Sequence, residues 1–430
     1  MYQKSVAFIC LCLCWLILGG NTASAQVNPV TADTVKISIK QAEDQFLRNN
    51  LQLIAQRYNI DNANAQIITA RLFPNPDFNY SNGIYATNIG QGPAYKESTY
   101  NFSQLFTTAG KRNKNIQLAK LGVDQARYQF FDLLRTLKYT LRNDFYNIYF
   151  QEQTSRVYNQ EINSLAKILS AFKEQYAKGN IAQKEVLRIQ SELYSLQVEY
   201  NNLQTNIDTV QSEFKLLTKA SPAVYVVPVV NEDNYTGKDL VTRVPYQQLL
   251  DSAFVNRYDL KLANTTLAYN NTNLSLQKAL AVPDFSLSVN YDKLGAYGNN
   301  YVGGGLEFNL PFFNRNQGAI KQARIAIEQS NIDLQNVQNQ VSMDVATNYK
   351  TALRMENLYN NFDPNFKVDF NHLIKEVFLN YEKRNISLLE FLDFYDSYKT
   401  NVIQLNGLQL SRINSLEQLN YVTATPFFNQ

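Results

Sequence analysis

The chain has 430 residues, with 40 Lys and Arg against 37 Asp and Glu, and a formal net charge of +3 at pH 7. This balance gives no electrostatic reason to expect nucleic acid as a partner. There is one histidine, His372, and the only three cysteines lie between residues 10 and 14, so little is left for a histidine- or cysteine-based catalytic or metal site. We therefore expect no enzymatic activity, no bound metal and no cofactor.

The first 25 residues have the pattern of a cleaved export signal. Lys4 supplies a positive start, residues 6–18 form an almost unbroken apolar run, and Ala-Ser-Ala at residues 23–25 matches a signal-peptidase site. Because Cys14 lies inside the apolar run rather than directly after it, we do not expect a lipid anchor. No later run reaches the roughly 20 apolar residues of a membrane helix. The much weaker signal of a membrane β-strand remains compatible with the sequence.

Two halves of the chain share one plan. LFPNPDF at residues 72–78 and LAVPDF at residues 280–285 each place Pro-Asp-Phe after a helix-like run, at an offset of 207. YAKGNIAQKEVL at residues 176–187 aligns with YEKRNISLLEFL at residues 381–392 at an offset of 205. Such repetition predicts a pseudo-symmetric architecture rather than two independent domains. We divide the chain into a signal peptide (1–25), a first repeat (26–218), a connecting, equatorial segment (219–244), a second repeat (245–421) and a C-terminal tail (422–430).

Each repeat is expected to contain unusually long helices. Residues 113–178 include one glycine, Gly122, and no proline, so a helix there would extend roughly 100 Å at 1.5 Å per residue. The equivalent stretch, 319–383, includes Pro364, where we expect a kink or a short break. After the first stretch, apolar residues recur at steps of four and three, as in a helix that packs along a neighbour: Ile189, Leu193, Leu196, Tyr200, Leu203, Ile207, Val210, Phe214 and Leu217.

After each Pro-Asp-Phe the hydrophobic period becomes two, which predicts β-hairpins at about 77–107 and 284–312. Pro74, Pro76 and Pro283 are the expected helix-to-strand joints, because proline lacks a backbone donor and favours an extended residue before it. The alternation fits a soluble sandwich as well as a membrane barrel. Four strands, however, cannot close a barrel with a wet interior, and open strand edges are not tolerated in lipid. Three copies would supply 12 strands, an even number within the range of membrane barrels.

This plan resembles the TolC-like outer-membrane efflux proteins, the outer membrane factors of tripartite efflux systems. The resemblance covers nearly all of residues 38–421. It rests on the duplication, on Pro-Asn-Pro at 74–76, on FTTAGKRNKNIQLAK at 106–120, and on the repeats that begin at Tyr176 and Tyr381. It implies a mainly α fold with a small membrane β-part. Each chain would contribute long α-helices and four β-strands to a trimeric 12-strand β-barrel and a periplasmic α-barrel tunnel.

The resemblance also implies a location in the outer membrane of a Gram-negative bacterium, with the strands against lipid and a long periplasmic portion. The homotrimer would conduct substrates passively. An inner-membrane pump of the resistance-nodulation-division type would supply energy, and a periplasmic adaptor (membrane fusion) protein would dock at the far tips. The Pro-Asn-Pro and Ala-Gly-Lys-Arg segments are more similar to the cobalt–zinc–cadmium-type branch than to the general drug-efflux branch. Heavy-metal cations and drugs or small molecules both stay open as the cargo.

In this family the periplasmic turns contact the adaptor and form the gate, and alignment places them at about 177–182 and 382–387. Tyr381 matches the tyrosine of the family's gate lock, whereas Ile386 stands where that lock has an arginine. The second turn also has an arginine in place of the first turn's glycine. The resemblance assigns the adaptor-contacting tips to Lys178, Gly179, Asn180, Lys383, Arg384 and Asn385.

Glu390 and Asp393 match the two acidic positions that ring the family's constriction. They are three residues apart and therefore share one helix face. Without the resemblance, the same pair would suit an ordinary solvated helix face. In the first repeat Glu185 and Arg188 take the equivalent positions, and Arg188 is a candidate partner for a carboxylate of a neighbouring helix. In a trimer the acidic pair would surround a narrow axis and favour cations.

A protein of another class stays open on sequence alone, namely a trimeric coiled-coil adhesin or a periplasmic structural protein without transport. Adhesins usually keep one membrane segment at the C-terminus. Here the hairpins lie inside each repeat, with helices on both sides. We therefore favour the exit duct.

Overall fold

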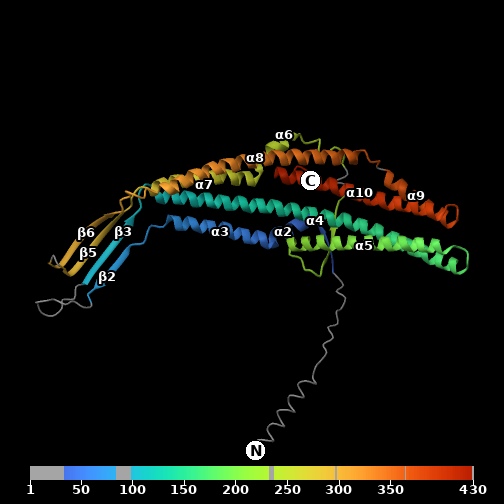
Figure 1. Ribbon diagram of the computed structural model, residues 1–430, viewed down its shortest axis with the longest axis horizontal. Coiled ribbons are helices and arrows are strands. Elements are labelled where there is room, and N and C mark those ends of the chain that lie inside the picture. Colours follow the sequence, from blue (N-terminus) through green and yellow to red (C-terminus); the bar gives the residue numbers. More distant parts are fainter. Residues whose placement is uncertain (1–32, 84–97, 232–236, 296–297, 364, 429–430) are drawn as a thin grey trace, which may run out of the picture.

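The computed structural model describes residues 33–83, 98–231, 237–295, 298–363 and 365–428. The predicted signal peptide, most of the first hairpin loop and Pro364 lie outside these residues. The described elements form an elongated array, with a β-sheet at one end and two helical turns at the other (Figure 1).

Helices account for most of the described chain. They are α2 (Ile39–Asn49), α3 (Leu51–Arg71), α4 (Lys111–Ala177), α5 (Gln183–Thr218), α6 (Tyr246–Asn256), α7 (Tyr258–Leu280), α8 (Gln317–Asn360), α9 (Phe366–Glu382) and α10 (Leu388–Thr423). The strands are β1 (Thr34–Ser38), β2 (Asp77–Asn82), β3 (Ser98–Phe106), β4 (Tyr225–Val229), β5 (Phe285–Gly295) and β6 (Gly298–Phe308). The predicted mainly α fold with a small β-part is confirmed.

Helix α4 runs almost the whole length of the array. It has 67 residues, which corresponds to roughly 100 Å. It contacts α3 and α7 toward the sheet, and α5 and α10 toward the far tip (Figure 1). The equivalent stretch of the second repeat is divided, because α8 ends at Asn360 and α9 begins at Phe366. The break expected in this stretch is therefore present.

Backbone conformation recurs at the offset seen in the sequence. Lys219 and Ala424, which are 205 residues apart, each directly follow a long helix, and their φ angles are 55° and 51°. Gly110 and Asn316, which are 206 residues apart, each directly precede a long helix, and their φ angles are 67° and 57°. A left-handed backbone is uncommon for residues other than glycine. Its recurrence at equivalent positions therefore means that the two halves fold alike.

One antiparallel sheet contains the strands of both repeats, in the order β2-β3-β5-β6. The repeats meet where β3 pairs with β5, with Phe106 opposite Phe285. One face of the sheet is apolar and aromatic, as the alternation predicts, and the other carries a polar row of Asn79, Asn101 and Asn290. Strands β2 and β6 are the two edges, and in the described chain neither has a partner on its outer side.

The second hairpin ends earlier than the sequence predicts. Strand pairing stops at Phe308 rather than at about residue 312. Pro311 has no backbone N–H to donate, and the backbone N–H of Phe312 donates to the carbonyl of Leu310 at 3.0 Å, which turns the chain. At the other end of the hairpin the pairing continues to Gly295 and Gly298.

Beside α2, which lies midway along the array (Figure 1), β1 pairs in parallel with β4. This region has its own buried core, which includes Phe46, Leu141, Phe145 and Phe214. A separate core between α4, α5, α9 and α10 supports the tip and includes Leu165, Ile189 and Phe391.

Among the described residues, no helix combines the length and the apolar character needed to cross a bilayer.

Candidate functional site at the helical tip

Two helical turns, one from each repeat, lie together at the end opposite the sheet (Figure 1). The first joins α4 to α5 and the second joins α9 to α10. A groove of about 850 Å³ runs between them. Its lining comes from both turns and the helices that enter them, and includes Lys167, Phe172, Gln175, Asn180, Ile181, Glu185, Phe378, Tyr381, Arg384 and Ile386.

The two turns have the same hydrogen-bond geometry. The N–H of Asn180 donates to the carbonyl of Gln175 at 2.9 Å, and the N–H of Asn385 donates to the carbonyl of Asn380, also at 2.9 Å. The same asparagines also donate their side-chain amides to Gln175 Oε1 at 2.8 Å and to Asn380 Oδ1 at 3.0 Å. The turns are therefore built as a matched pair, locked by backbone and side chain alike.

At the sheet end, each helix-to-strand change takes place in the segment that contains the predicted prolines. α3 ends at Arg71 and β2 begins at Asp77, and α7 ends at Leu280 before β5 begins at Phe285. The second of these joints is tied to the start of α4. Lys111 Nζ donates to the carbonyl of Val282 and to Asp284 Oδ1, both at 2.7 Å.

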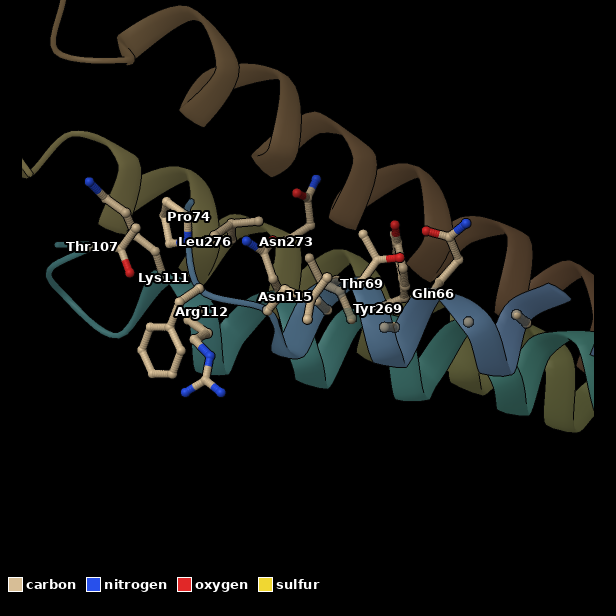
Figure 2. Close-up of a pocket in the computed structure, with 17 residues that line it drawn as sticks. Gln66, Thr69, Pro74, Thr107, Lys111, Arg112, Asn115, Tyr269, Asn273 and Leu276 are labelled. Atoms are coloured by element: carbon tan, nitrogen blue, oxygen red, sulfur yellow. The ribbon is translucent and has the colours of Figure 1, made fainter. Parts of the chain in front are cut away.

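A pocket of about 850 Å³ lies beside the first joint, between α3, α4 and α7 (Figure 2). Amide, hydroxyl and aliphatic side chains line it, and Arg112 places its guanidinium 4.1 Å from the centre of the Phe73 ring. Arg112 Nε also donates to the carbonyl of Arg71 at 2.8 Å, which anchors the end of α3. Within the described residues, no three His, Cys, Asp or Glu side chains are grouped so that they could hold a metal ion.

The family model described as "Outer membrane efflux protein" matches residues 43–218, from α2 to the end of α5. Over these residues the chain is similar to the outer membrane efflux protein family. The predicted resemblance is thereby confirmed. No curated protein matches this chain in sequence.

Solved structures share the fold of this chain over both repeats. The CmeC outer membrane channel of Campylobacter jejuni is 16% identical with a TM-score of 0.73, covering 90% of this chain and 86% of CmeC. The open state of the MtrE outer membrane channel of Neisseria gonorrhoeae is also 16% identical with a TM-score of 0.73, and the match covers 90% of this chain and 89% of MtrE. The outer membrane protein VceC of Vibrio cholerae is 15% identical with a TM-score of 0.71, and the match covers 90% of this chain and 96% of VceC.

Glu390, a predicted gate carboxylate, caps α10. Its Oε2 accepts from the N–H and the hydroxyl of Ser387, both at 2.8 Å, and its own N–H donates to Ser387 Oγ at 3.2 Å. These hydrogen bonds lower the pKa of Glu390. The reciprocal bonds form a capping box, and the Ser-x-x-Glu spacing would have revealed it. In the first repeat Ala182 replaces Ser387 and makes no side-chain cap.

The other predicted gate residues have different surroundings. Asp393 and Arg188 are exposed and Glu185 is half-buried. Arg188 makes no ion pair with Glu390 or Asp393 within the described chain, so a pairing between subunits stays a prediction. Tyr381 stacks on Phe391 with ring centres 4.4 Å apart. This aromatic cluster, which also includes Phe172, Phe378 and Tyr395, is a feature that sequence reasoning missed.

Tyr381 is held inside this tip rather than at its surface. Its hydroxyl is buried and has no hydrogen-bond partner in the described chain. Burial, followed by the negative charge of Glu185, raises the pKa of Tyr381. The hydroxyl therefore stays protonated and is available as a donor if the tip rearranges.

Arg384 replaces the turn glycine at a position with φ of 60°, where Gly179 of the first turn has φ of 74°. An L-residue pays roughly 1–2 kcal/mol for this conformation, partly offset by glycine's greater freedom when unfolded. We expect Arg384→Gly to stabilise the second turn by about 1 kcal/mol and to slow amide hydrogen exchange at residues 383–387. Gly179→Ala, the matched control, should accelerate exchange in the first turn. Faster exchange in both variants would contradict the strain assigned to Arg384.

Proposed function

We propose that this protein is the outer-membrane exit duct of a tripartite efflux pump and works as a homotrimer. The observation that carries the proposal is a four-stranded sheet at the end of a long helical array, whose two edges have no partner strand among the described residues. Open edges are not tolerated in lipid. Three copies joined edge to edge supply 12 strands, which close a barrel of an allowed even number.

The two faces of the sheet suit this barrel. Phe78 is 68% exposed and Val302 66% exposed in the single chain, and both lie on the apolar face that would meet lipid. The opposite face would line the lumen. There Asn101 Nδ2 donates to Asn290 Oδ1 at 2.6 Å, and the amide row continues to Asn79. Such a wall is polar, and the register places the carboxylates of Asp77, Asp292 and Glu307 on the same face.

At the far end, the exposed turns are the proposed docking surface for a periplasmic adaptor. All six predicted contact residues are exposed, and three are basic: Lys178, Lys383 and Arg384. This charge favours an adaptor surface that carries carboxylates. An inner-membrane pump of the resistance-nodulation-division type supplies the energy, and the duct itself is passive.

We assign the periplasmic constriction to Glu390 and Asp393, assisted by Glu185, Arg188 and Tyr381. In a trimer the two carboxylates of each chain would surround the axis and favour cations. The duct offers no selective site for one cargo in its described walls. The proposed cargo is either heavy-metal cations or drugs and small molecules, and selectivity rests with the pump.

Bilayer recordings of the purified protein test this function. Glu390→Gln with Asp393→Asn should keep the capping box, since glutamine also serves at that position, while lowering the ratio of cation to anion permeability. Ser387→Ala is the matched control, because it breaks the cap and leaves the charge unchanged. Unchanged selectivity in the double variant would reject the acidic ring. A wild-type protein that forms no pore would reject the duct and favour the structural or adhesin alternative.

A further inference from the structure

We propose that a collar of basic side chains beside the sheet binds the phosphate groups of anionic phospholipids in the periplasmic leaflet of the outer membrane. The proposal rests on the membrane-embedded sheet of the proposed function, and it adds the class of lipid and the residues that recognise it. The basic collar consists of Arg71, Lys111, Arg112, Lys114, Lys120, Lys278, Arg315, Lys321 and Arg324.

The helix segments that adjoin the sheet are strongly basic, although the whole chain has 40 basic and 37 acidic residues. The collar's nine Lys and Arg, and no Asp or Glu, occur in the segments 62–76, 107–123, 262–283 and 309–327. These segments include the ends of α3, α4, α7 and α8 that lie beside the sheet (Figure 1). This end of the helical array therefore carries an excess of positive charge that the overall composition hides.

The carboxylates nearest to the collar do not neutralise it. Asp284 lies 2.7 Å from Lys111 Nζ, and this is the collar's one ion pair among the described residues. Asp77 and Glu307 lie on the polar face of the sheet, which the proposed barrel turns toward the lumen. The other eight basic side chains are therefore left for an anion from outside the chain.

Helical geometry turns two of these lysines away from the lumen. Lys111 lines both the pocket beside the first joint and a cavity that includes Glu307 of the polar face, so both hollows lie on the lumen side. Lys120 follows Lys111 by nine residues, or about 2.5 turns, and therefore lies on the opposite face of α4. The same spacing separates Lys278 from Tyr269, which lines that pocket on α7. Lys120 and Lys278 thus face outward, and both are exposed.

Both outward lysines are within reach of the headgroups. Lys278 is two residues from the end of α7, and Lys120 is nine residues from the start of α4, or about 14 Å at 1.5 Å per residue. Headgroups extend roughly 5–7 Å beyond the hydrocarbon, and a charged surface is felt over about 8 Å more at physiological salt. A lysine stem also carries its ammonium toward the interface.

The surface around these lysines offers further donors. Asn113 and Gln117 lie seven and three residues before Lys120, so they share its face of α4, and both are exposed. Helix α7, which carries Lys278, packs against α4. Two ammonium groups and two amides therefore lie on one outward surface. Ammonium and amide N–H groups donate to phosphate oxygens, and the bonds from ammonium are the stronger.

Native mass spectrometry of the detergent-solubilised protein tests the collar, with phosphatidylglycerol as the anionic probe and phosphatidylcholine as the probe without net charge. The wild type should bind phosphatidylglycerol more tightly. Lys120→Gln with Lys278→Gln should lower that affinity at least fivefold, because each basic residue near an anionic surface contributes about fivefold. Binding of phosphatidylcholine should not change. Lys173→Gln with Lys350→Gln is the matched control, since both lysines are exposed on α4 and α8, far from the sheet.

Three results would overturn the collar and leave the duct intact, provided that crosslinking still captures a trimer. They are equal affinity of the wild type for the two lipids, unchanged affinity for phosphatidylglycerol in the Lys120 and Lys278 variant, and an equal loss in the control variant. Displacement of the lipid by inorganic phosphate at equal concentration would also overturn it, by assigning the lysines to free anions.

Bilayer recordings check the outward direction of the two lysines. A changed ratio of cation to anion permeability in the Lys120 and Lys278 variant would place them in the lumen and overturn the proposal. An unchanged ratio together with weaker binding of phosphatidylglycerol supports it. A wild-type protein that neither trimerises nor forms a pore would reject the proposed function as well.

Discussion

Arg412→Ala should lower the free energy of unfolding by about 3–5 kcal/mol, because it leaves a buried carboxylate without its partner. Arg412 Nη2 lies 2.9 Å from Glu356 Oε1, and the two side chains are 2% and 1% exposed. The guanidinium also stacks 3.9 Å from the centre of the Tyr359 ring. The pair joins α8 to α10 near the middle of the molecule.

Glu356 also holds the connecting segment. Its carboxylate oxygens accept from the backbone N–H of Leu240 at 3.1 Å and of Val241 at 2.9 Å, while Arg412 donates to the carbonyl of Gly237. Loss of the guanidinium therefore releases this segment from the helices as well as unpairing a charge.

Urea unfolding followed by circular dichroism in detergent measures the effect. Arg354→Ala is the control, because this exposed arginine lies on α8, the helix that carries Glu356. Surface substitutions usually change the free energy of unfolding by no more than about 0.5 kcal/mol. Glu356→Leu with Arg412→Met should recover much of the loss, since both charges are then removed together. A loss of unfolding free energy in Arg412→Ala no larger than in Arg354→Ala would contradict the stabilising role of the buried ion pair.

Asp144→Asn should stabilise the protein at pH 9 and leave it nearly unchanged at pH 4. Burial, followed by the negative charge of Glu213, raises the pKa of Asp144 to about 8 from an ordinary value of 3.8. Its Oδ2 is buried with no hydrogen-bond partner among the described residues. The folded protein therefore binds a proton there that the unfolded chain loses.

The sign of the pH dependence follows from that proton. Its contribution to stability is fully present below about pH 4, declines as pH rises, and is lost above about pH 8. At pH 9 the ionised carboxylate costs up to about 5 kcal/mol, which the amide avoids. Unfolding should be compared at pH 5, 7 and 9, with exposed Asp333→Asn as the control. A stability gain that is equal at all three pH values would contradict the buried, protonated carboxyl.

Glu161 is a second buried carboxyl on α4, and burial raises its pKa to about 7. The stability that the protonated Glu161 carboxyl contributes should decline between about pH 4.5 and pH 7. Measuring Asp144→Asn in a Glu161→Gln background separates the two pH ranges.

The candidate site could be predicted in part. The tip turns were found because Tyr-x-Lys-x-Asn-Ile recurs in the two halves, and the internal repeat needs no tertiary information. The capping box that Glu390 forms was missed, although the Ser387 spacing carried the signal. The stacking of Tyr381 on Phe391 could not be predicted, because it depends on how α9 and α10 cross.

The long helices, the helix-to-strand joints and the alternating strands follow from the sequence alone, because each depends on neighbours a few residues apart, such as the absence of proline around Gly122 or the period of two after Pro283. The duplication is likewise visible without a structure, by aligning the two halves. Only the tertiary structure decided that Phe106 lies opposite Phe285, that Arg412 reaches Glu356, and that Asp144 is buried. These depend on distances between residues far apart in the chain, and hydrophobic periodicity does not encode which polar group on one helix faces which on another.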